Sequence, residues 1–173
     1  MNAKALPWFV FPTLLFAMGL VRVARHAQTA SAAVDNATEV DYCRLTEDSS
    51  AYSGRKVRVR AAYRFGFEWS AMYCPKCVNV GETWVSLDEN AQDRPSIRRL
   101  RKMVAKHSGL GQTVEGTFIG TFHDGGHYGH LGEYKYEVVI EEVINLHVVY
   151  RVGVRADALP DQVRHSLCKQ DSP

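Results

Sequence analysis

Three histidines lie within eight residues of a glycine-rich stretch, HDGGHYGH, at positions 123–130. Imidazole nitrogens bind zinc and copper, so His123, His127 and His130 could form a metal site with a neighbouring carboxylate. Their spacings of four and three residues are helical, but the four glycines among and just after them disfavour a helix. The pattern therefore favours a glycine-rich turn between two strands. Zinc bound at these histidines is the alternative interpretation.

The second group of residues that could do chemistry is the C-x-x-C motif of Cys74 and Cys77. Redox pairs of this spacing work at the N-terminus of a helix, where the helix dipole lowers the pKa of the first thiol. Here the motif follows an aromatic segment and precedes VNVGETW, which has no helical pattern. With Cys43 or Cys168 and a histidine, the reduced pair could instead bind zinc.

Structural disulfides are the third interpretation of the cysteines, and an exported chain would favour it because even sets of cysteines usually pair outside the cytoplasm. Pairing Cys43 with Cys74 would tie the entrance of the chain to the second strand. Pairing Cys77 with Cys168 would then pin the C-terminal tail. Four cysteines allow three connectivities, and the sequence does not choose among them.

Residues 1–32 predict export. They combine a positively charged start, the apolar run ALPWFVFPTLLFAMGLV at 5–21, and the small residues ASA at 30–32, which suit signal-peptidase cleavage. We therefore predict a signal peptide over 1–32 and a periplasmic or secreted protein. The alternative is an uncleaved membrane anchor formed by residues 5–21.

The charge of the chain limits its partners. The formal net charge is +2, but without residues 1–32 the 21 basic residues fall to 18, against 19 acidic residues. A nearly neutral domain has no general attraction for nucleic acid or anionic membranes. An envelope protein or a small ligand is therefore the predicted partner, and any membrane contact would come from an uncleaved N-terminal segment.

Alternation of apolar and polar residues predicts the strands that must position these groups. Val57, Val59, Ala61 and Tyr63 alternate with basic residues, as in a strand with one buried face. Further strands are predicted from FGFEWSAMY at 65–73, TWVSL at 83–87, QTVEGTFIGTF at 112–122 and EYKYEVVIEEVI at 133–144. The segment LHVVYRV at 146–152 extends the last strand or adds a sixth.

One helix is predicted between the third and fourth strands, over residues 93–109. Asp93 is a plausible cap, Pro95 suits the first turn, and Ile97, Leu100 and Val104 form one apolar stripe. A short helix is also predicted in the tail, because Leu159, Val163 and Leu167 recur every four residues.

This order predicts a mainly β fold of the OB type, a five- or six-stranded antiparallel barrel with its helix between strands three and four. The barrel would span residues 33–152, followed by a tail over 153–173. A generic α+β sandwich is the competing architecture.

The segments VDYCRL, YSGRKVRVRAAYRFGFEW, VEGTFIG and YGHLGEYKYEVVIEEV resemble a group of small exported bacterial proteins of unknown function with an OB-like domain. Cys43 matches a cysteine before the first strand, residues 54–59 match the glycine and alternating valines that open it, and Cys74 matches a cysteine after the second strand. Cys77 departs from the pattern. The resemblance covers residues 40–145 and implies the fold without an activity.

Aromatic residues suggest where a ligand would bind. OB-folds bind oligonucleotides or sugars on the second and third strands and on adjoining loops, where Trp69, Trp84 and Tyr128 lie. We predict a non-catalytic binding or scaffolding domain of the cell envelope that needs no cofactor. The alternatives are a metal-dependent hydrolase at the three histidines, a redox protein using Cys74 and Cys77, and a binder of single-stranded nucleic acid or saccharides.

Overall fold

The computed structural model describes residues 36–105 and 111–169 of the 173-residue chain. The predicted signal peptide and the end of the predicted 93–109 helix lie outside these ranges. Within them, no helix is long and apolar enough to cross a membrane.

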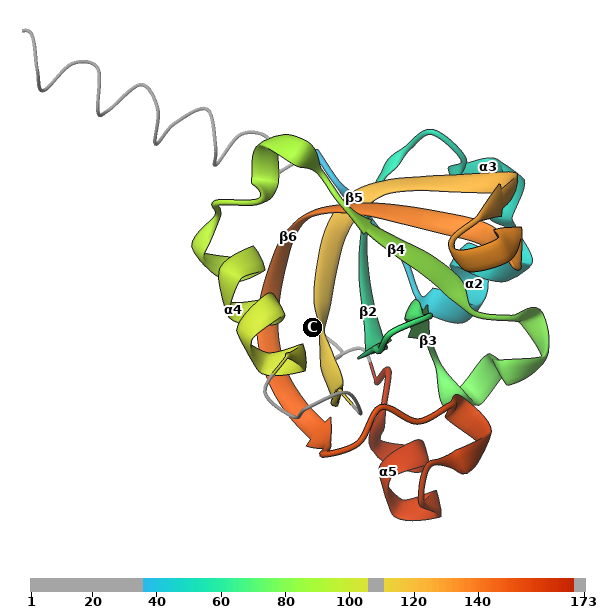
Figure 1. Ribbon diagram of the computed structural model, residues 1–173. Helices are drawn as coiled ribbons and strands as arrows, with labels where there is room; N and C mark the ends of the chain where they lie inside the picture. Colours follow the sequence, from blue (N-terminus) through green and yellow to red (C-terminus); the bar gives the residue numbers. More distant parts are fainter. Residues whose placement is uncertain (1–35, 106–110, 170–173) are drawn as a thin grey trace, which may run out of the picture. The chain divides into compact units, whose positions relative to one another are not determined.

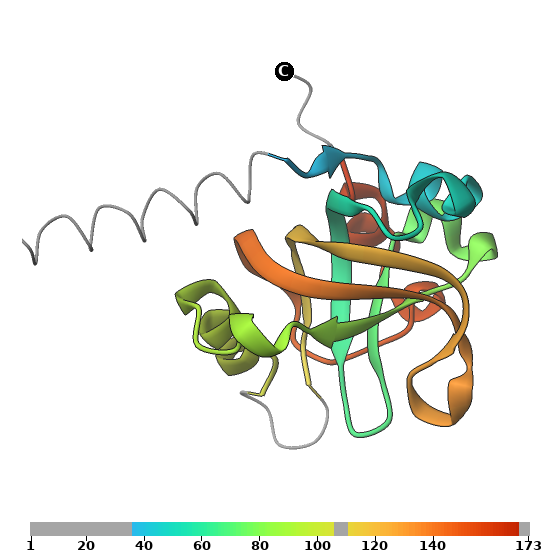
Figure 2. The same ribbon diagram turned by 90° about the horizontal axis from the view of Figure 1, so that it is seen from above.

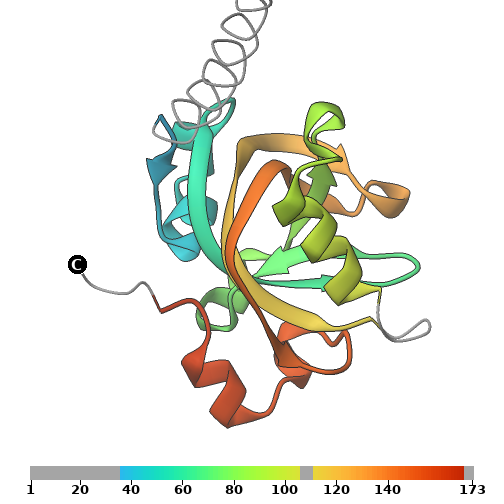
Figure 3. The same cartoon turned by 90° about the vertical axis from the view of Figure 1, so that its left-hand side faces the viewer.

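The structure is mainly β. Six strands form one mixed sheet: β1 (Thr38–Glu39), β2 (Lys56–Phe65), β3 (Ser70–Tyr73), β4 (Thr83–Leu87), β5 (Thr113–Tyr128) and β6 (Tyr134–Tyr150). The pairing runs from β2 through β3, β4, β6 and β5, and β5 pairs again with β2. The hydrogen bonds between neighbouring strands therefore form a closed ring, and the long strands are curved (Figures 1 and 3).

The sheet is not purely antiparallel as the sequence predicted. β4 runs parallel to β6, and β1 runs parallel to β2, whereas the other pairings are antiparallel. The chain leaves β4, passes through a helix and β5, and enters β6 in the direction of β4. Alternation in a sequence shows which face of a strand is buried, but it does not show the direction of the neighbouring strand.

The inner face of the sheet holds the residues that alternation selects. Val57, Val59 and Ala61 of β2 are fully buried, while the basic residues between them are half-buried. In β5 the backbone of Gly120 lies so close to β6 that a Cβ there would be 2.1 Å from the carbonyl oxygen of Val139. Glycine at this position therefore permits the close approach of the two longest strands.

The predicted strand over residues 65–73 is present, but it is shorter than predicted. β2 continues to Phe65, the chain turns over residues 66–69, and β3 contains only Ser70–Tyr73. Of the aromatic residues in this segment, Phe67 and Trp69 lie in the turn of the β2–β3 hairpin. The last predicted strand, by contrast, continues through residue 150 as one long β6.

Four α-helices accompany the sheet: α2 (Tyr42–Glu47), α3 (Ser49–Tyr52), α4 (Pro95–Val104) and α5 (Asp161–Ser166). Short 3-10 turns occupy Pro75–Val80, Glu89–Ala91, His130–Gly132 and Ala156–Ala158. In Figure 1, α4 lies on one side of the sheet, and α2 and α3 lie on the other.

Helix α4 buries the predicted stripe of Ile97, Leu100 and Val104. It begins at Pro95 after Arg94, so Asp93 is not its cap. Proline suits this first position because its missing N–H group would have no partner within the helix.

Helix α2 was not predicted, although the sequence contains its start signal. The Asp41 carboxylate accepts hydrogen bonds from the N–H groups of Cys43 and Arg44, which satisfies the helix start. The next residue, Tyr42, is fully buried, and its hydroxyl lies 2.9 Å from the Met72 carbonyl and 2.9 Å from the Thr83 hydroxyl. These contacts fix α2 against β3 and β4 and so fix the position of Cys43.

Candidate functional site

A groove of about 720 Å³ lies between the β2–β3 hairpin, β4 and α4. Its lining is mostly aromatic and aliphatic, and it includes Tyr63, Phe67, Trp69, Trp84, Leu100 and Val104. Figure 2 shows the hairpin projecting from the sheet on the side where α4 lies. Two of the three predicted ligand-binding residues, Trp69 and Trp84, therefore meet in one groove.

The hairpin exposes two phenylalanines that the sequence analysis did not select. Phe67 at the tip is 95% exposed, and Phe65 is 41% exposed. Large apolar side chains gain favourable free energy when a partner removes them from water, so exposed ones mark a surface where a partner could bind. Both were predicted to lie on the second strand, whereas Phe65 ends β2 and Phe67 lies in the turn before β3. Their exposure was therefore not predicted.

Trp69 is held in place beneath this tip. Its indole ring packs on Gly66, where a Cβ would lie 2.2 Å from the ring. The Arg64 guanidinium lies 5.3 Å from the ring centroid and pairs with Glu82 at 2.6 Å. This stacking fixes the ring at the wall of the groove.

Trp84 forms the opposite wall and is also fixed by its neighbours. Its ring lies 5.2 Å from the Tyr134 ring and packs on Gly129. The φ angle of Gly129 is 71°, a backbone conformation that suits glycine because it has no side chain. Its indole N–H donates to the Ser86 hydroxyl at 3.2 Å, and Ser86 donates to Glu137 at 2.6 Å. The polar groups beside Trp84 are therefore bonded to each other.

The polar groups at the floor of the groove are also hydrogen-bonded within the protein. The Ser70 hydroxyl donates to the Val85 carbonyl at 2.8 Å and lies 3.0 Å from the Tyr63 hydroxyl. Burial raises the pKa of Tyr63 to about 12, with the hydrogen bond to Ser70 opposing, so this phenol stays neutral at physiological pH. The groove therefore offers apolar contact more than hydrogen bonds.

Positive charge lies along the exposed side of the groove. α4 contains Arg98, Arg99, Arg101 and Lys102 and no acidic residue. Arg98 contacts the Asp93 carbonyl, Arg99 donates to the Leu146 carbonyl at 3.2 Å, and Arg101 donates to the Gln92 side-chain oxygen at 3.2 Å. These acceptors are neutral, so the helix keeps its positive charge.

Tyr128, the third predicted ligand-binding residue, is not among the residues that line the groove. It ends β5 and pairs with Tyr134 of β6, where its ring packs on Gly126. The structure thus places it in the neighbouring β5–β6 hairpin.

The three histidines lie along this hairpin. β5 continues to residue 128, so His123 and His127 are in the strand, and His130 is in the turn that follows. The His127 Nδ1 atom lies 3.4 Å from the Gly132 carbonyl oxygen. In the described residues, the group of at least three His, Cys, Asp or Glu side chains with converging ligand atoms is a different one, formed by cysteines.

A second hollow of about 520 Å³ lies beyond Arg64, between the start of β6 and the segment around Arg155. Its lining carries both signs of charge, and four of these charges pair: Arg64 with Glu82 at 2.6 Å and Arg155 with Asp157 at 3.7 Å. Its aromatic lining consists of tyrosines, without the tryptophans and phenylalanines of the groove.

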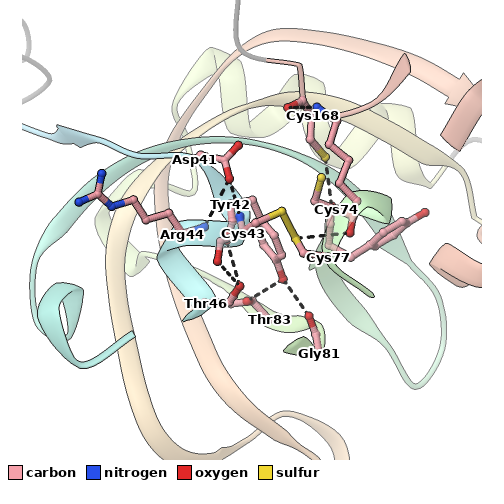
Figure 4. Close-up of a disulfide and its surroundings, with 12 residues drawn as sticks. Asp41, Tyr42, Cys43, Arg44, Thr46, Cys74, Cys77, Gly81, Thr83 and Cys168 are labelled. Atoms are coloured by element: carbon pink, nitrogen blue, oxygen red, sulfur yellow. Dashed lines mark hydrogen bonds between the residues drawn. A yellow bond between two sulfur atoms is a disulfide. The ribbon is translucent and has the colours of Figure 1, made fainter. Parts of the chain in front are cut away.

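The converging cysteines differ from the predicted pairs. Cys43 of α2 forms a disulfide with Cys77, whereas the proposed bonds joined Cys43 to Cys74 and Cys77 to Cys168 (Figure 4). The Sγ atoms of Cys43, Cys74 and Cys77 lie within 4.8 Å of one another. Two of these sulfurs are bonded to each other, so the three do not form a ligand set for a metal in this structure. Cys74 and Cys77 are not bonded to each other either.

The remaining two cysteines, Cys74 and Cys168, are free, and their exposures are 1% and 2%. Figure 4 shows the two thiols directed toward each other. The hydrogen bond from Cys168 lowers the pKa of Cys74, with burial opposing. The same bond, together with burial, raises the pKa of Cys168.

Glu115, a buried carboxylate of β5, holds Cys168 in this position. It accepts the Cys168 backbone N–H at 2.8 Å and pairs with Arg60 at 3.3 Å and His147 at 3.2 Å. Cys168 has a positive φ of 58°, a conformation that costs a non-glycine residue free energy unless its surroundings impose it. The carboxylate therefore fixes Cys168 against β5.

We expect the substitution Glu115→Gln to lower the free energy of unfolding by about 2 kcal/mol, because the hydrogen bonds to Cys168 and Arg60 lose their charged acceptor. Urea denaturation of the purified variant measures the loss. Glu142→Gln on β6 is the control, since its carboxylate is half-buried and outside this network. Equal stability of the two variants would contradict the role given to Glu115.

Comparison with known proteins identifies no relative, because neither a protein-family model nor a curated protein sequence matches the chain.

Proposed function

We propose that this protein is an exported, non-catalytic binding domain of the cell envelope, and that its binding site is the groove between the β2–β3 hairpin, β4 and α4. The observation that carries the proposal is the combination of an aromatic groove of about 720 Å³ with the 95% exposed Phe67 at its edge. Concave sites with apolar walls and a few directed polar groups are the usual ligand sites of proteins.

An OB-like barrel is the architecture we propose for this domain. The ring order β2-β3-β4-β6-β5 and the place of α4 in the chain between β4 and β5 support it. In such folds the face of the second and third strands binds ligands. Here these strands are β3 and β4, which border the groove. The resemblance to exported bacterial OB-like proteins is consistent with the same proposal.

The chemistry of the groove favours a polypeptide segment as the ligand. Sugars need many hydrogen bonds, but Ser70, Ser86 and Trp84 already use theirs within the protein. Single-stranded nucleic acid needs a continuous positive groove. α4 supplies positive charge on one side of this groove, but Arg64, which stacks on Trp69 at the wall, is paired with Glu82. Apolar and aromatic side chains of a partner protein match the apolar walls, in which the buried indole N–H of Trp69 has no hydrogen-bond partner.

The charge of α4 defines the partner further. Arg101 lines the apolar groove, and Arg98 and Lys102 are exposed on the same helix. Acidic residues that flank an apolar segment would complement this surface and raise the rate of association. We therefore infer that the partner is an envelope protein with an aromatic segment flanked by acidic residues.

The disulfide between Cys43 and Cys77 supports the proposed compartment. Disulfides persist outside the cytoplasm and are rare where thiols are kept reduced. Export of the chain into an oxidising space, directed by residues 1–32, is the simplest route to this bond.

The test is selection of binders from a library of random peptides against immobilised protein. We expect peptides rich in aromatic and acidic residues, which compete with one another for one site. Phe67→Ser should weaken their binding by about tenfold, or roughly 1.4 kcal/mol. Leu131→Ser is the matched control, because Leu131 is 82% exposed on the other hairpin and does not line the groove.

Two results would overturn the proposal. The first is recovery of no peptide that distinguishes the wild type from Phe67→Ser. The second is binding of a short labelled oligo(dT) strand, or of a soluble β-glucan oligosaccharide, that Phe67→Ser weakens while the peptides do not compete. The second result would assign the groove to nucleic acid or saccharide instead.

A further inference from the structure

The buried thiols of Cys74 and Cys168 lie beside the Cys43–Cys77 disulfide, and the binding groove does not involve them. We propose that Cys74 and Cys168 form a second disulfide, and that they acquire it by thiol–disulfide exchange through the Cys43–Cys77 bond. This inference is independent of the proposed binding function.

The positions of the sulfur atoms carry the first step of the inference. The Cys74 Sγ atom lies within 4.8 Å of both bonded sulfurs, which brings a nucleophile and a disulfide close together. A disulfide exchanges when a thiolate attacks one of its sulfurs, and Cys74 is the member of the cluster whose pKa is lowered. The nucleophile and its target are therefore neighbours in the folded protein.

The position of Cys168 carries the second step. Its thiol faces Cys74, and its Sγ atom lies 3.8 Å from the carbonyl oxygen of Tyr73, the residue before Cys74. Glu115 holds its backbone N–H at 2.8 Å, and Lys76 Nζ lies 3.4 Å from its carbonyl oxygen. Cys168 is therefore fixed where it can resolve a disulfide on Cys74.

The exchange conserves electrons without an external reagent. The Cys74 thiolate attacks the Sγ atom of Cys43 or Cys77 and forms a bond to it, while the other sulfur leaves as a thiolate. Cys168 then loses its proton to that thiolate and attacks Cys74 Sγ, which forms the Cys74–Cys168 bond and releases the second sulfur. One disulfide and two thiols are present before and after.

The exposure of the four cysteines gives the exchange a consequence. Cys43 and Cys77 are half-buried, whereas Cys74 and Cys168 are almost completely buried. After exchange, the thiols of Cys43 and Cys77 can react with an external disulfide such as oxidised glutathione. Two protein thiols then become one disulfide, and oxidised glutathione becomes two reduced molecules. A buried pair is thus oxidised through a more accessible one.

The first experiment uses the unmodified protein, purified with one disulfide and incubated without oxidant. Acid quenching, alkylation in denaturant and peptide mass mapping then locate the bond. We expect two one-disulfide forms, with the bond at Cys43–Cys77 or at Cys74–Cys168. Addition of oxidised glutathione should lower the number of thiols that become alkylated from two to zero. Finding the bond at Cys43–Cys77 in all chains without oxidant would overturn the exchange route.

The second experiment uses the double variant Cys43→Ser/Cys77→Ser, after a cooperative melting transition has shown that it folds. We expect oxidised glutathione to form the Cys74–Cys168 bond at least about tenfold more slowly than in the unmodified protein. An equal rate would overturn the route. If the variant does not fold, Cys168→Ser replaces it. In that variant the first step should trap the bond between Cys74 and Cys43 or Cys77, and its absence there would count against the inference.

Discussion

The substitution Phe118→Ala should lower the free energy of unfolding by about 3–5 kcal/mol, the largest loss that we expect from a single residue. Phe118 is fully buried in β5, and its ring lies 5.9 Å from the ring of Tyr63 in an edge-to-face contact. Truncation removes a large apolar side chain and leaves a cavity that the paired strands on both sides cannot close. The melting temperature should fall by roughly 10–20 °C.

Thermal unfolding followed by circular dichroism checks this prediction, with Phe118→Leu as the control. Leucine keeps most of the apolar volume, so its cost should be roughly 1–1.5 kcal/mol. Tyr63 also lines the groove, so Phe118→Ala should loosen the groove floor and weaken peptide binding at temperatures where the variant is still folded. Similar losses for alanine and leucine would mean that Phe118 is not central to the core.

The strands could be predicted wherever one face is buried and the other is wet. Val57, Val59 and Ala61 are buried between half-buried basic residues, so their alternation was visible in the sequence. TWVSL was predicted with the bounds of β4, and the apolar stripe of α4 was also recognised. Local periodicity carries this information because it reflects burial.

Other features depend on contacts between distant segments, which periodicity does not reveal. The parallel pairing of β4 with β6 follows from the path of the chain and not from either strand. The helix at Tyr42–Glu47 is too short to show a period, and the Asp41 cap was its one clear signal. The turn at residues 66–69 was not predicted, because the spacing of its aromatic residues is that of a buried strand.

The candidate site was predictable to the same extent. Trp69 and Trp84 were selected because they were predicted to lie on adjacent strands, and they do line one groove, whereas Tyr128 does not. The sequence did not show that α4 borders the same groove. The pairing of Cys43 with Cys77 depends on where α2 meets the turn after β3, which no spacing rule specifies.

Removing the Cys43–Cys77 bond should cost about 2–4 kcal/mol, because the bond closes a loop of 34 residues and restricts the unfolded chain. The loop contains α2, α3, β2 and β3, so the bond ties the entrance of the domain to the segment after its first hairpin. Cys43→Ser/Cys77→Ser should therefore lose this stability in urea denaturation.

Reduction supplies the matched control for this variant. Dithiothreitol should lower the melting temperature of the wild type toward that of the double variant. It should leave the double variant unchanged when that variant has been kept free of oxidant, because Cys74 and Cys168 are then thiols and there is no bond to reduce. A fall in both proteins would show that the reductant acts elsewhere.

The same bond reports the compartment: alkylation of intact cells with a thiol reagent should find Cys43 and Cys77 protected until reduction. Free alkylation of both cysteines in cells would contradict an oxidising location, since this half-buried disulfide would be reduced by cytoplasmic thiols.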